Sequence, residues 1–326
     1  MQSCDNFAVV YGIVQLQYGR VFAPFRNRGS TTTHQRPSST RTCIENPKIP
    51  TKTLSSGHKI PVIGLGTWGI LKDEVKFAVT TAIYRLIDSA FVYQNEKFVG
   101  QAIKQMLQEK VVKRCDIFIT TKLWNTYHQP DLVSQAIRLS LNVLQLSYLD
   151  LYLMHWPTAY QEGKILLPRD TQGHTKFSDI DYVETWKAME ELQDLGLTKT
   201  IGISNFNRAV LQCECHPFLN QKRLMEFCRC RDIVFMAYSP WGSSETRPYA
   251  VKGEERLLES KEIVDMDDSY HKTPAQILIR YQIQRGNIVI PKSIQKSRIE
   301  SNLNAFNWEL TFGDMNKNLR YVNKIQ

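Results

Sequence analysis

The chain has 326 residues, of which 42% are hydrophobic, and a formal net charge of +9. This length suits one large α/β barrel or two ordinary domains. No apolar run approaches the about 18 residues of a membrane-spanning helix, so we expect a soluble chain with no membrane partner. The positive charge forms no basic run with interleaved aromatic residues, so we expect no nucleic-acid partner. A basic pocket for one phosphorylated small molecule explains the charge better.

Residues 1–50 differ in composition from the rest of the chain. They contain six Lys or Arg residues, two acids and runs rich in Ser and Thr. A leader of this kind has the composition of a mitochondrial transit segment, but Asp5 and weak amphipathicity argue against that reading. We therefore expect a disordered basic extension over 1–50 and an enzyme barrel over 51–326. A cytoplasmic location is expected, with a mitochondrial one as the alternative.

From Thr51 onwards, short apolar segments alternate with longer amphipathic ones. The predicted strands are Ile60–Thr67, Arg85–Ala90, Ile117–Leu123, Leu149–His155, Thr200–Asn205, Ala209–Glu214, Ile233–Ser239 and Ile288–Lys292. The predicted helices are 72–84, 94–108, 131–146, 181–195, 220–231 and 274–285. Strands that alternate with helices of this length form βαβ units around a parallel sheet. Eight of them predict an α/β fold, the (β/α)8 TIM barrel.

The interval between Asn205 and Ala209 breaks this alternation. Only Phe206, Asn207 and Arg208 separate the two predicted strands, whereas parallel neighbours need a crossover of about a dozen residues. Either these strands are misassigned, or the barrel lacks the helix between strands five and six. A link of three residues could join the two strands only as an antiparallel hairpin. Loss of the helix would expose the barrel strands that it normally covers.

Four chemically active residues follow the apolar runs: Asp88, Tyr93, Lys122 and His155. Side chains at the carboxyl ends of parallel barrel strands converge on one mouth, where such folds place their chemistry. Each residue alone is more often structural or solvated. Together, an acid, a phenol, an ammonium and an imidazole predict a set that donates a proton to a carbonyl oxygen.

The seven cysteines favour free thiols in a reducing compartment. Cys213 and Cys215 are two residues apart, as are Cys228 and Cys230, which is not the usual spacing of a zinc site. We therefore expect no metal.

Six motifs, in order from about residue 52 to 312, resemble those of the aldo-keto reductase family, and most closely its aldose and aldehyde reductase branch. The motifs are Ile63–Trp68, Tyr84–Ala90 with Tyr93–Glu96, Lys122–Trp124, Met154–Pro157, Gly202–Phe206 and Ile290–Ser293. The resemblance implies a metal-free barrel enzyme, expected to be a monomer, that reduces aldehydes or ketones with NADPH. The absence of a Gly-x-Gly-x-x-Gly motif argues against a Rossmann fold.

The resemblance also implies the role of each catalytic residue. Tyr93 would be the general acid, although a free phenol titrates near ~10 and is a poor donor at neutral pH. Lys122 would lower the pKa of Tyr93, because a nearby cation favours the phenolate. Asp88 would hold Lys122 in place, and His155 would orient the substrate oxygen.

The resemblance further implies a cofactor site. Ser204, Asn205 and Gln212 would bind the nicotinamide carboxamide, and Tyr238 would stack on the ring. Lys292, Ser293 and Arg298 would clamp the 2′-phosphate, which favours NADPH over NADH. Asn302 would contact adenine, whereas Ser301 stands where the family usually has Glu. The predicted cofactor set is completed by Thr67, Trp68, Asp88 and Ser239.

The substrate set comprises Tyr93 and His155 with three tryptophans, Trp68, Trp124 and Trp156, which would line an apolar pocket. Core packing is the alternative role for these large aromatic side chains.

The chain departs from the family at three places. Ala82–Tyr84 lacks about three residues, including the glycine that normally turns the first helix into the second strand. The link after Asn205 is about sixteen residues shorter. Only 33 residues follow Ser293, so most of the C-terminal specificity loop is expected to be absent.

These departures leave two alternatives to an active reductase. One is a catalytically impaired or incomplete family member that binds nucleotide without turnover. The other is a phosphate-binding barrel isomerase, for which Trp241–Ser244 is only a faint glycine-rich match.

Overall fold

The computed structural model describes residues 49–206, 211–242 and 256–319. The predicted extension over 1–50 lies almost entirely outside these residues. The first elements are β1 (Thr51–Thr53) and β2 (Lys59–Pro61), which pair as an antiparallel hairpin. Leu54 and Ile60 of this hairpin pack against Leu86, Phe118 and Ile288 from the amino ends of the barrel strands. The hairpin therefore covers the end of the barrel opposite the carboxyl ends of its strands.

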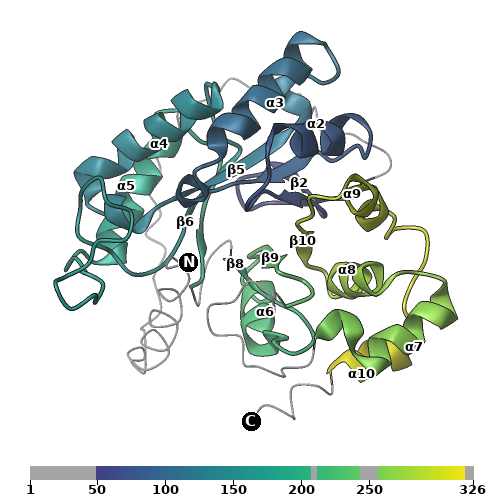
Figure 1. The fold of residues 1–326 in the computed structure, drawn as a ribbon. Helices are drawn as coiled ribbons and strands as arrows, with labels where there is room; N and C mark the ends of the chain where they lie inside the picture. The colour runs from purple at the N-terminus through teal and green to yellow at the C-terminus, as the bar shows by residue number, and fades with distance from the viewer. Residues whose placement is uncertain (1–48, 207–210, 243–255, 320–326) are drawn as a thin grey trace. The chain divides into compact units, whose positions relative to one another are not determined.

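Eight parallel strands, hydrogen-bonded in chain order, form the barrel (Figure 1). They are β3 (Leu65–Gly66), β4 (Leu86–Asp88), β5 (Phe118–Leu123), β6 (Leu151–Met154), β7 (Ile201–Ser204), β8 (Leu211–Glu214), β9 (Phe235–Tyr238) and β10 (Ile288–Ile290). A parallel bridge between Ile63 and Val289 joins the first strand to the last. A Cβ at Gly66 would lie 3.1 Å from the Ile290 carbonyl oxygen, so this seam needs glycine.

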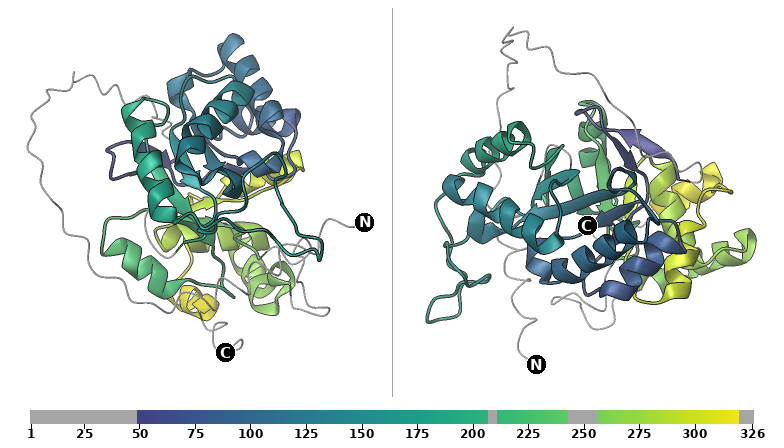
Figure 2. Two further views of the ribbon diagram at one scale, coloured as in Figure 1. Left: turned by 90° about the vertical axis from the view of Figure 1, so that its left-hand side faces the viewer. Right: turned by 90° about the horizontal axis from the view of Figure 1, so that it is seen from above.

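Helices cover the outside of the strands (Figures 1 and 2). They are α2 (Lys72–Thr80), α3 (Glu96–Gln108), α4 (Pro130–Leu144), α5 (Tyr182–Asp194), α6 (Lys222–Arg229), α7 (Lys261–Tyr270), α8 (Pro274–Gln284), α9 (Lys296–Leu303) and α10 (Phe312–Leu319). Packing of α9 against α2 continues the ring of helices across the seam. The predicted (β/α)8 TIM barrel is confirmed.

The predicted elements differ from the observed ones in two ways. The first predicted strand, Ile60–Thr67, is divided between the hairpin strand β2 and the barrel strand β3. Helices α7, α9 and α10 were not among the predicted helices. Among the described residues, no helix has the length and apolar character needed to cross a membrane.

The link between β7 and β8 corrects one expectation. The two strands pair in parallel, Ile203 with Leu211 and Ser204 with Gln212, so the antiparallel hairpin is wrong. Strand β8 begins at Leu211, and its first residue lies beside Ile203, near the end of β7. Residues 207–210, between the two strands, lie outside the described residues, so the expected absence of the crossover helix stays a prediction.

The expected exposure of these strands is also wrong. Every residue of β7 and of β8 is buried. Phe206, just after β7, packs edge-on against Tyr182 of α5, with ring centroids 5.4 Å apart.

The chain passes from α2 to β4 through a residue in the left-handed conformation, although no glycine is present there. Ile83 has φ of 62°, and the Tyr84 N–H donates to the Ala78 carbonyl at 2.8 Å. A β-branched residue is strained in this region, because its Cβ crowds the following carbonyl. The chain thus makes this turn without the usual glycine, by holding Ile83 in a strained left-handed conformation.

Candidate active site

A buried ion pair forms the centre of the mouth. Lys122, on β5, is fully buried, and its Nζ donates to Asp88 Oδ1, at the end of β4, at 2.6 Å. The same Nζ donates to the Ser89 carbonyl at 2.7 Å. Gln212 Nε2 of β8 donates to the second carboxylate oxygen, Asp88 Oδ2, at 2.7 Å. The three hydrogen bonds fix the lysine and the aspartate in one arrangement across the barrel.

Tyr93 and His155 lie beside this pair. Tyr93 ends the short 3-10 helix Phe91–Tyr93 that follows β4, and Lys122 Nζ lies 5.3 Å from its ring centroid. His155 follows β6, and its ring meets that of Tyr93 edge-on at 6.0 Å. The structure therefore brings together the acid, phenol, ammonium and imidazole expected from the sequence.

Burial and charge set the protonation of the four groups. Burial raises the pKa of Tyr93 above its usual value, while the charge and hydrogen bond of Lys122 act to lower it. The net direction is therefore opposite to the lowering expected from the sequence. Burial acts to lower the pKa of Lys122, but Asp88 and Tyr93 hold it above its ordinary value. The lysine is a cation and the tyrosine a protonated phenol at neutral pH.

His155 is a neutral imidazole. Burial, together with the positive charge of Lys122, holds the pKa of His155 well below its ordinary range. Within the described residues, its buried Nδ1 has no hydrogen-bond partner. Its backbone is held at both ends, because its N–H donates to Leu123 at 3.1 Å and its carbonyl accepts from Asn205 Nδ2 at 2.9 Å. A neutral ring can donate a hydrogen bond to a carbonyl oxygen without adding a charge.

The predicted nicotinamide contacts converge on the opposite side of the mouth. Asn205 takes the left-handed conformation with φ of 64°, and its Oδ1 accepts from the Tyr238 hydroxyl at 2.8 Å. Ser204 Oγ donates to the Gln212 carbonyl at 3.1 Å. The hydrogen bonds join the ends of β7, β8 and β9 and bring these hydroxyl, amide and aromatic groups together. Ser239 follows Tyr238 directly.

The predicted phosphate contacts lie after β10. Lys292 and Arg298 are exposed, and neither forms an ion pair with a carboxylate of the described residues. Ser293 and Asn302 are largely buried, at 9% and 4% exposure. Two cations without a carboxylate partner among the described residues have the charge that a phosphate dianion needs.

The three tryptophans differ in exposure. Trp68 is 59% exposed and packs on Tyr93 with ring centroids 5.4 Å apart. Trp124 is buried, donates from Nε1 to the Leu166 carbonyl at 2.7 Å and meets His155 edge-on. Trp156 stacks on His155 at 6.3 Å. All three therefore lie against Tyr93 or His155, as expected of a substrate pocket, although Trp124 is also part of the core.

One residue that positions the mouth, Asn95, had no predicted role. Asn95 is buried, and its Nδ2 donates to the carbonyls of Thr67 at 2.6 Å and Ile70 at 2.9 Å. Thr67 in turn donates from its hydroxyl to the Asp88 carbonyl at 3.0 Å. Asn95 lies in the Tyr93–Glu96 motif, so its position in that motif was the available signal.

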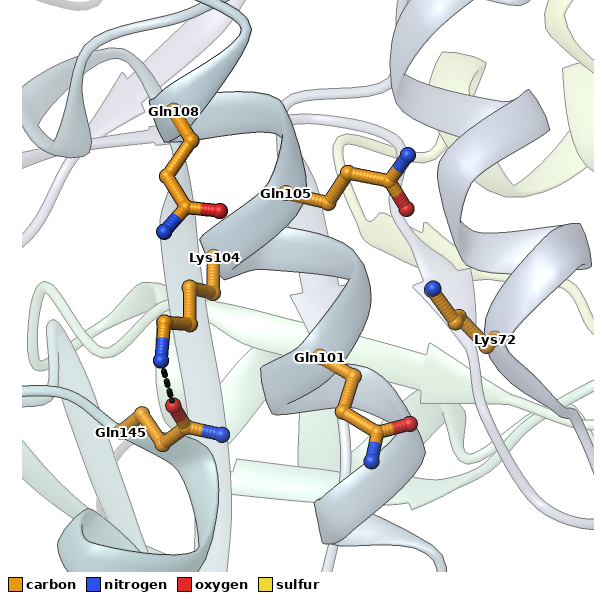
Figure 3. A pocket seen from close by; sticks show the side chains of 6 residues that line it. All are labelled: Lys72, Gln101, Lys104, Gln105, Gln108 and Gln145. Atoms are coloured by element: carbon orange, nitrogen blue, oxygen red, sulfur yellow. Dashed lines mark hydrogen bonds between the residues drawn. The ribbon is translucent and has the colours of Figure 1, made fainter.

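A second hollow lies elsewhere on the molecule (Figure 3). It has a volume of about 470 Å³ and is lined by Lys72, Gln101, Lys104, Gln105, Gln108 and Gln145, on α2, on α3 and just after α4. Lys104 Nζ donates to Gln145 Oε1 at 2.8 Å. Its lining holds no carboxylate, imidazole, thiol or phenol, so we assign the chemistry to the barrel mouth instead.

Among the described residues, no group of three or more His, Cys, Asp or Glu side chains is arranged to hold a metal ion. Cys213, Cys215 and Cys228 are buried free thiols, and Cys230 is exposed.

A parallel barrel with a proton-donating set at the carboxyl ends of its strands, beside amide and cationic groups suited to a dinucleotide, defines a class of carbonyl-reducing oxidoreductases. Residues 62–319 match the model of the aldo/keto reductase family.

Curated relatives agree. Aldo-keto reductase family 1 member A1-A of Danio rerio is 46% identical over 296 residues, 83% of this chain and 91% of the relative. Estradiol 17 beta-dehydrogenase 5 of Mus musculus is 43% identical over 303 residues, covering 84% of this chain and 94% of the relative. Prostaglandin-E(2) 9-reductase of Oryctolagus cuniculus is 42% identical over 305 residues, covering 85% and 94%. The chain belongs to the aldo/keto reductase family, whose members use nicotinamide cofactors.

Proposed function

We propose that this chain reduces aldehydes or ketones to alcohols with NADPH, and that Tyr93 is the general acid. The observation that carries the proposal is the buried Lys122–Asp88 pair, 2.6 Å apart, beside the phenol of Tyr93 and the imidazole of His155. When bound, the dihydronicotinamide supplies a hydride to the carbonyl carbon.

The residues of the chain manage the proton. Tyr93 donates its hydroxyl proton to the carbonyl oxygen as negative charge develops there. Lys122 stabilises the phenolate that remains, because a cation in a buried site acts strongly on a nearby anion. Asp88 keeps Lys122 oriented, and neutral His155 holds the carbonyl oxygen by a hydrogen bond. Trp68, Trp124 and Trp156 exclude water around these groups and favour bulky, apolar carbonyl substrates.

The preference for NADPH over NADH rests on Lys292, Ser293 and Arg298. A charged hydrogen bond to a phosphate contributes about 1.5–3 kcal/mol, or roughly 10- to 150-fold in affinity. We expect Arg298→Ala to weaken NADPH binding by that factor and to leave NADH binding unchanged, as measured by quenching of tryptophan fluorescence. Equal loss for both cofactors would argue against the 2′-phosphate as its ligand.

Turnover is tested with Tyr93→Phe. This variant should bind NADPH as wild type does and reduce aldehydes at least about 100-fold more slowly, because the acid is lost and the ring is kept. Persistent turnover would remove Tyr93 from its proposed role. Saturable binding by the wild type without turnover would favour the nucleotide-binding alternative. The cytoplasmic location and the monomeric state stay predictions, which imaging of the tagged full chain and light scattering can test.

A further inference from the structure

Glu96 is a buried carboxylate that the proposed reaction leaves without a role. It is the first residue of α3 and only 3% exposed. Its Oε1 accepts from Thr121 Oγ1 at 2.6 Å, and its Oε2 accepts from Ser140 Oγ of α4 at 3.1 Å. Both oxygens act as acceptors, as the ionised form requires, and the start of a helix also favours a negative charge.

Glu96 is linked to both Lys122 and Tyr93, the cation and the acid of the proposed reaction. Successive residues of a strand face opposite sides, so Thr121 of β5 points outwards to Glu96 of α3 while Lys122 points inwards to Asp88. The hydrogen bond from Thr121 thus ties Glu96 to the residue that immediately precedes Lys122. On the other side, Glu96 follows Tyr93 by three residues.

The short segment from Tyr93 to Glu96 is held rigidly. Asn95 fixes its middle to the loop after β3 through the two bonds from its Nδ2 to Thr67 and Ile70. With that segment fixed, the bond between Glu96 and Thr121 sets where β5 lies relative to Tyr93. The separation of Tyr93 and Lys122 therefore depends on Glu96.

The charge of Glu96 acts on the same pair. Burial raises the pKa of Glu96, while its bonds to Thr121 and Ser140 and the positive charge of Lys122 act to lower it. Another titratable group that experiences Glu96 is Tyr152 of β6: its pKa is raised well above its usual value by burial, then by Glu96, and then by Tyr127. Asp88, Tyr93 and His155 surround Lys122 beyond β5. Lys122 is thus the cation that experiences the Glu96 carboxylate.

We propose that Glu96 is a positioning residue for the reduction: it sets the separation between Tyr93 and Lys122, and its negative charge favours the protonated forms of both. This inference rests on the proposed function of Tyr93 as the acid. Removal of the charge should lower the pKa at which the coupled pair loses its proton. Because reduction needs the protonated phenol, the rate should then fall at a lower pH than in the wild type.

Two variants separate position from charge. Glu96→Gln keeps the size of the side chain and an oxygen that can accept from Thr121, but removes the charge. Thr121→Val keeps the charge and removes the bond. Glu109→Gln, the same substitution on an exposed residue that caps the end of α3, is the matched control. The measurements are kcat and KM for an aldehyde from pH 6 to 10, NADPH affinity from tryptophan quenching, and thermal unfolding.

We expect Glu96→Gln to lower kcat about tenfold or more and to shift its alkaline limb down by about 0.5–1 pH unit, with NADPH affinity nearly unchanged. Thr121→Val should lower kcat similarly without moving the limb. Unchanged kcat and pH profile in Glu96→Gln, alongside an inactive Tyr93→Phe, would overturn this inference alone. An inactive wild type or an active Tyr93→Phe would overturn the proposed function, and this inference with it. Should Glu96→Gln not fold, an unchanged kcat in Thr121→Val overturns the inference.

Discussion

Replacing Lys122 by methionine tests how the mouth is held together. Methionine matches the lysine stem but leaves Asp88, whose side chain is 3% exposed, without its cation. Breaking one partner of a buried pair costs about 3–5 kcal/mol, because the remaining charge stays buried. The bond from Gln212 to the other carboxylate oxygen offsets part of this loss, so we expect about 3 kcal/mol. At about 2–4 °C per kcal/mol, the melting temperature should fall by about 6–12 °C.

The assay is thermal unfolding by calorimetry of wild type, Lys122→Met and the double variant Lys122→Met/Asp88→Asn. The double variant should recover stability, since it no longer buries an unpaired charge. The pH dependence has a fixed sign: the pKa of Lys122 is raised in the folded chain, so its contribution is complete below about 10.5 and is lost as pH rises through the folded value. A melting temperature of Lys122→Met within about 2 °C of wild type at pH 7 would refute this reasoning.

Three further predictions concern stability. Ile83→Gly should raise the free energy of unfolding by about 0.5–1 kcal/mol in denaturant titrations, because the left-handed penalty of about 1–2 kcal/mol exceeds the entropy cost of glycine, whereas Ile83→Ala should give no gain. Asp150→Asn should cost about 2–4 kcal/mol, since the buried Asp150 meets Arg114 at 2.8 Å and Lys199 at 2.9 Å, while Asp265→Asn at the exposed pair with Lys261 should cost under about 1 kcal/mol. Burial lowers the pKa of His128 to about 3, so its contribution is present above about pH 6.5 and is lost as pH falls towards 3; His128→Gln should flatten that acid loss by about 1.4 kcal/mol per pH unit, and an unchanged slope would contradict it.

The sequence predicted the barrel because its apolar runs match buried strands. Three of the strands are buried at every position, so each coincides with an apolar run in the sequence. They are Leu86–Asp88, Phe118–Leu123 and Leu151–Met154. The helices α7, α9 and α10 were missed for the converse reason. Their buried positions, such as Ile263 and Met266, are few and lie between charged residues, so amphipathic periodicity is weak.

The link after β7 shows what a local pattern cannot provide. The direction expected for β8 was wrong, because a rule about crossover length says nothing about an offset in register. Pairing Leu211 beside Ile203, rather than beside the start of β7, shortens the distance to be spanned. Such an offset depends on contacts across the whole sheet.

The four proton-donating residues could be brought to one mouth by topology alone, since each lies at or just after the carboxyl end of a parallel strand. Their electrostatic balance could not. Whether Lys122 or burial dominates at Tyr93 depends on how completely the surrounding side chains exclude water, and this is a property of the packed molecule. The roles of Asn95 and Glu96 were missed for a similar reason, because their partners lie 25 to 44 residues away in sequence.

The residues at the mouth fall into two groups that come from different parts of the chain. Every group proposed to move or hold the proton belongs to β4, β5 and β6 or the turns after them, and most of those proposed to hold the cofactor follow β7, β9 and β10. Laboratory selection could therefore change the cofactor preference through substitutions in the second half of the chain. The proton-donating residues in the first half would stay as they are. Gln212 of β8 donates to Asp88 and so joins the two groups. If segments are exchanged between relatives, the residue at position 212 must therefore still fit Asp88.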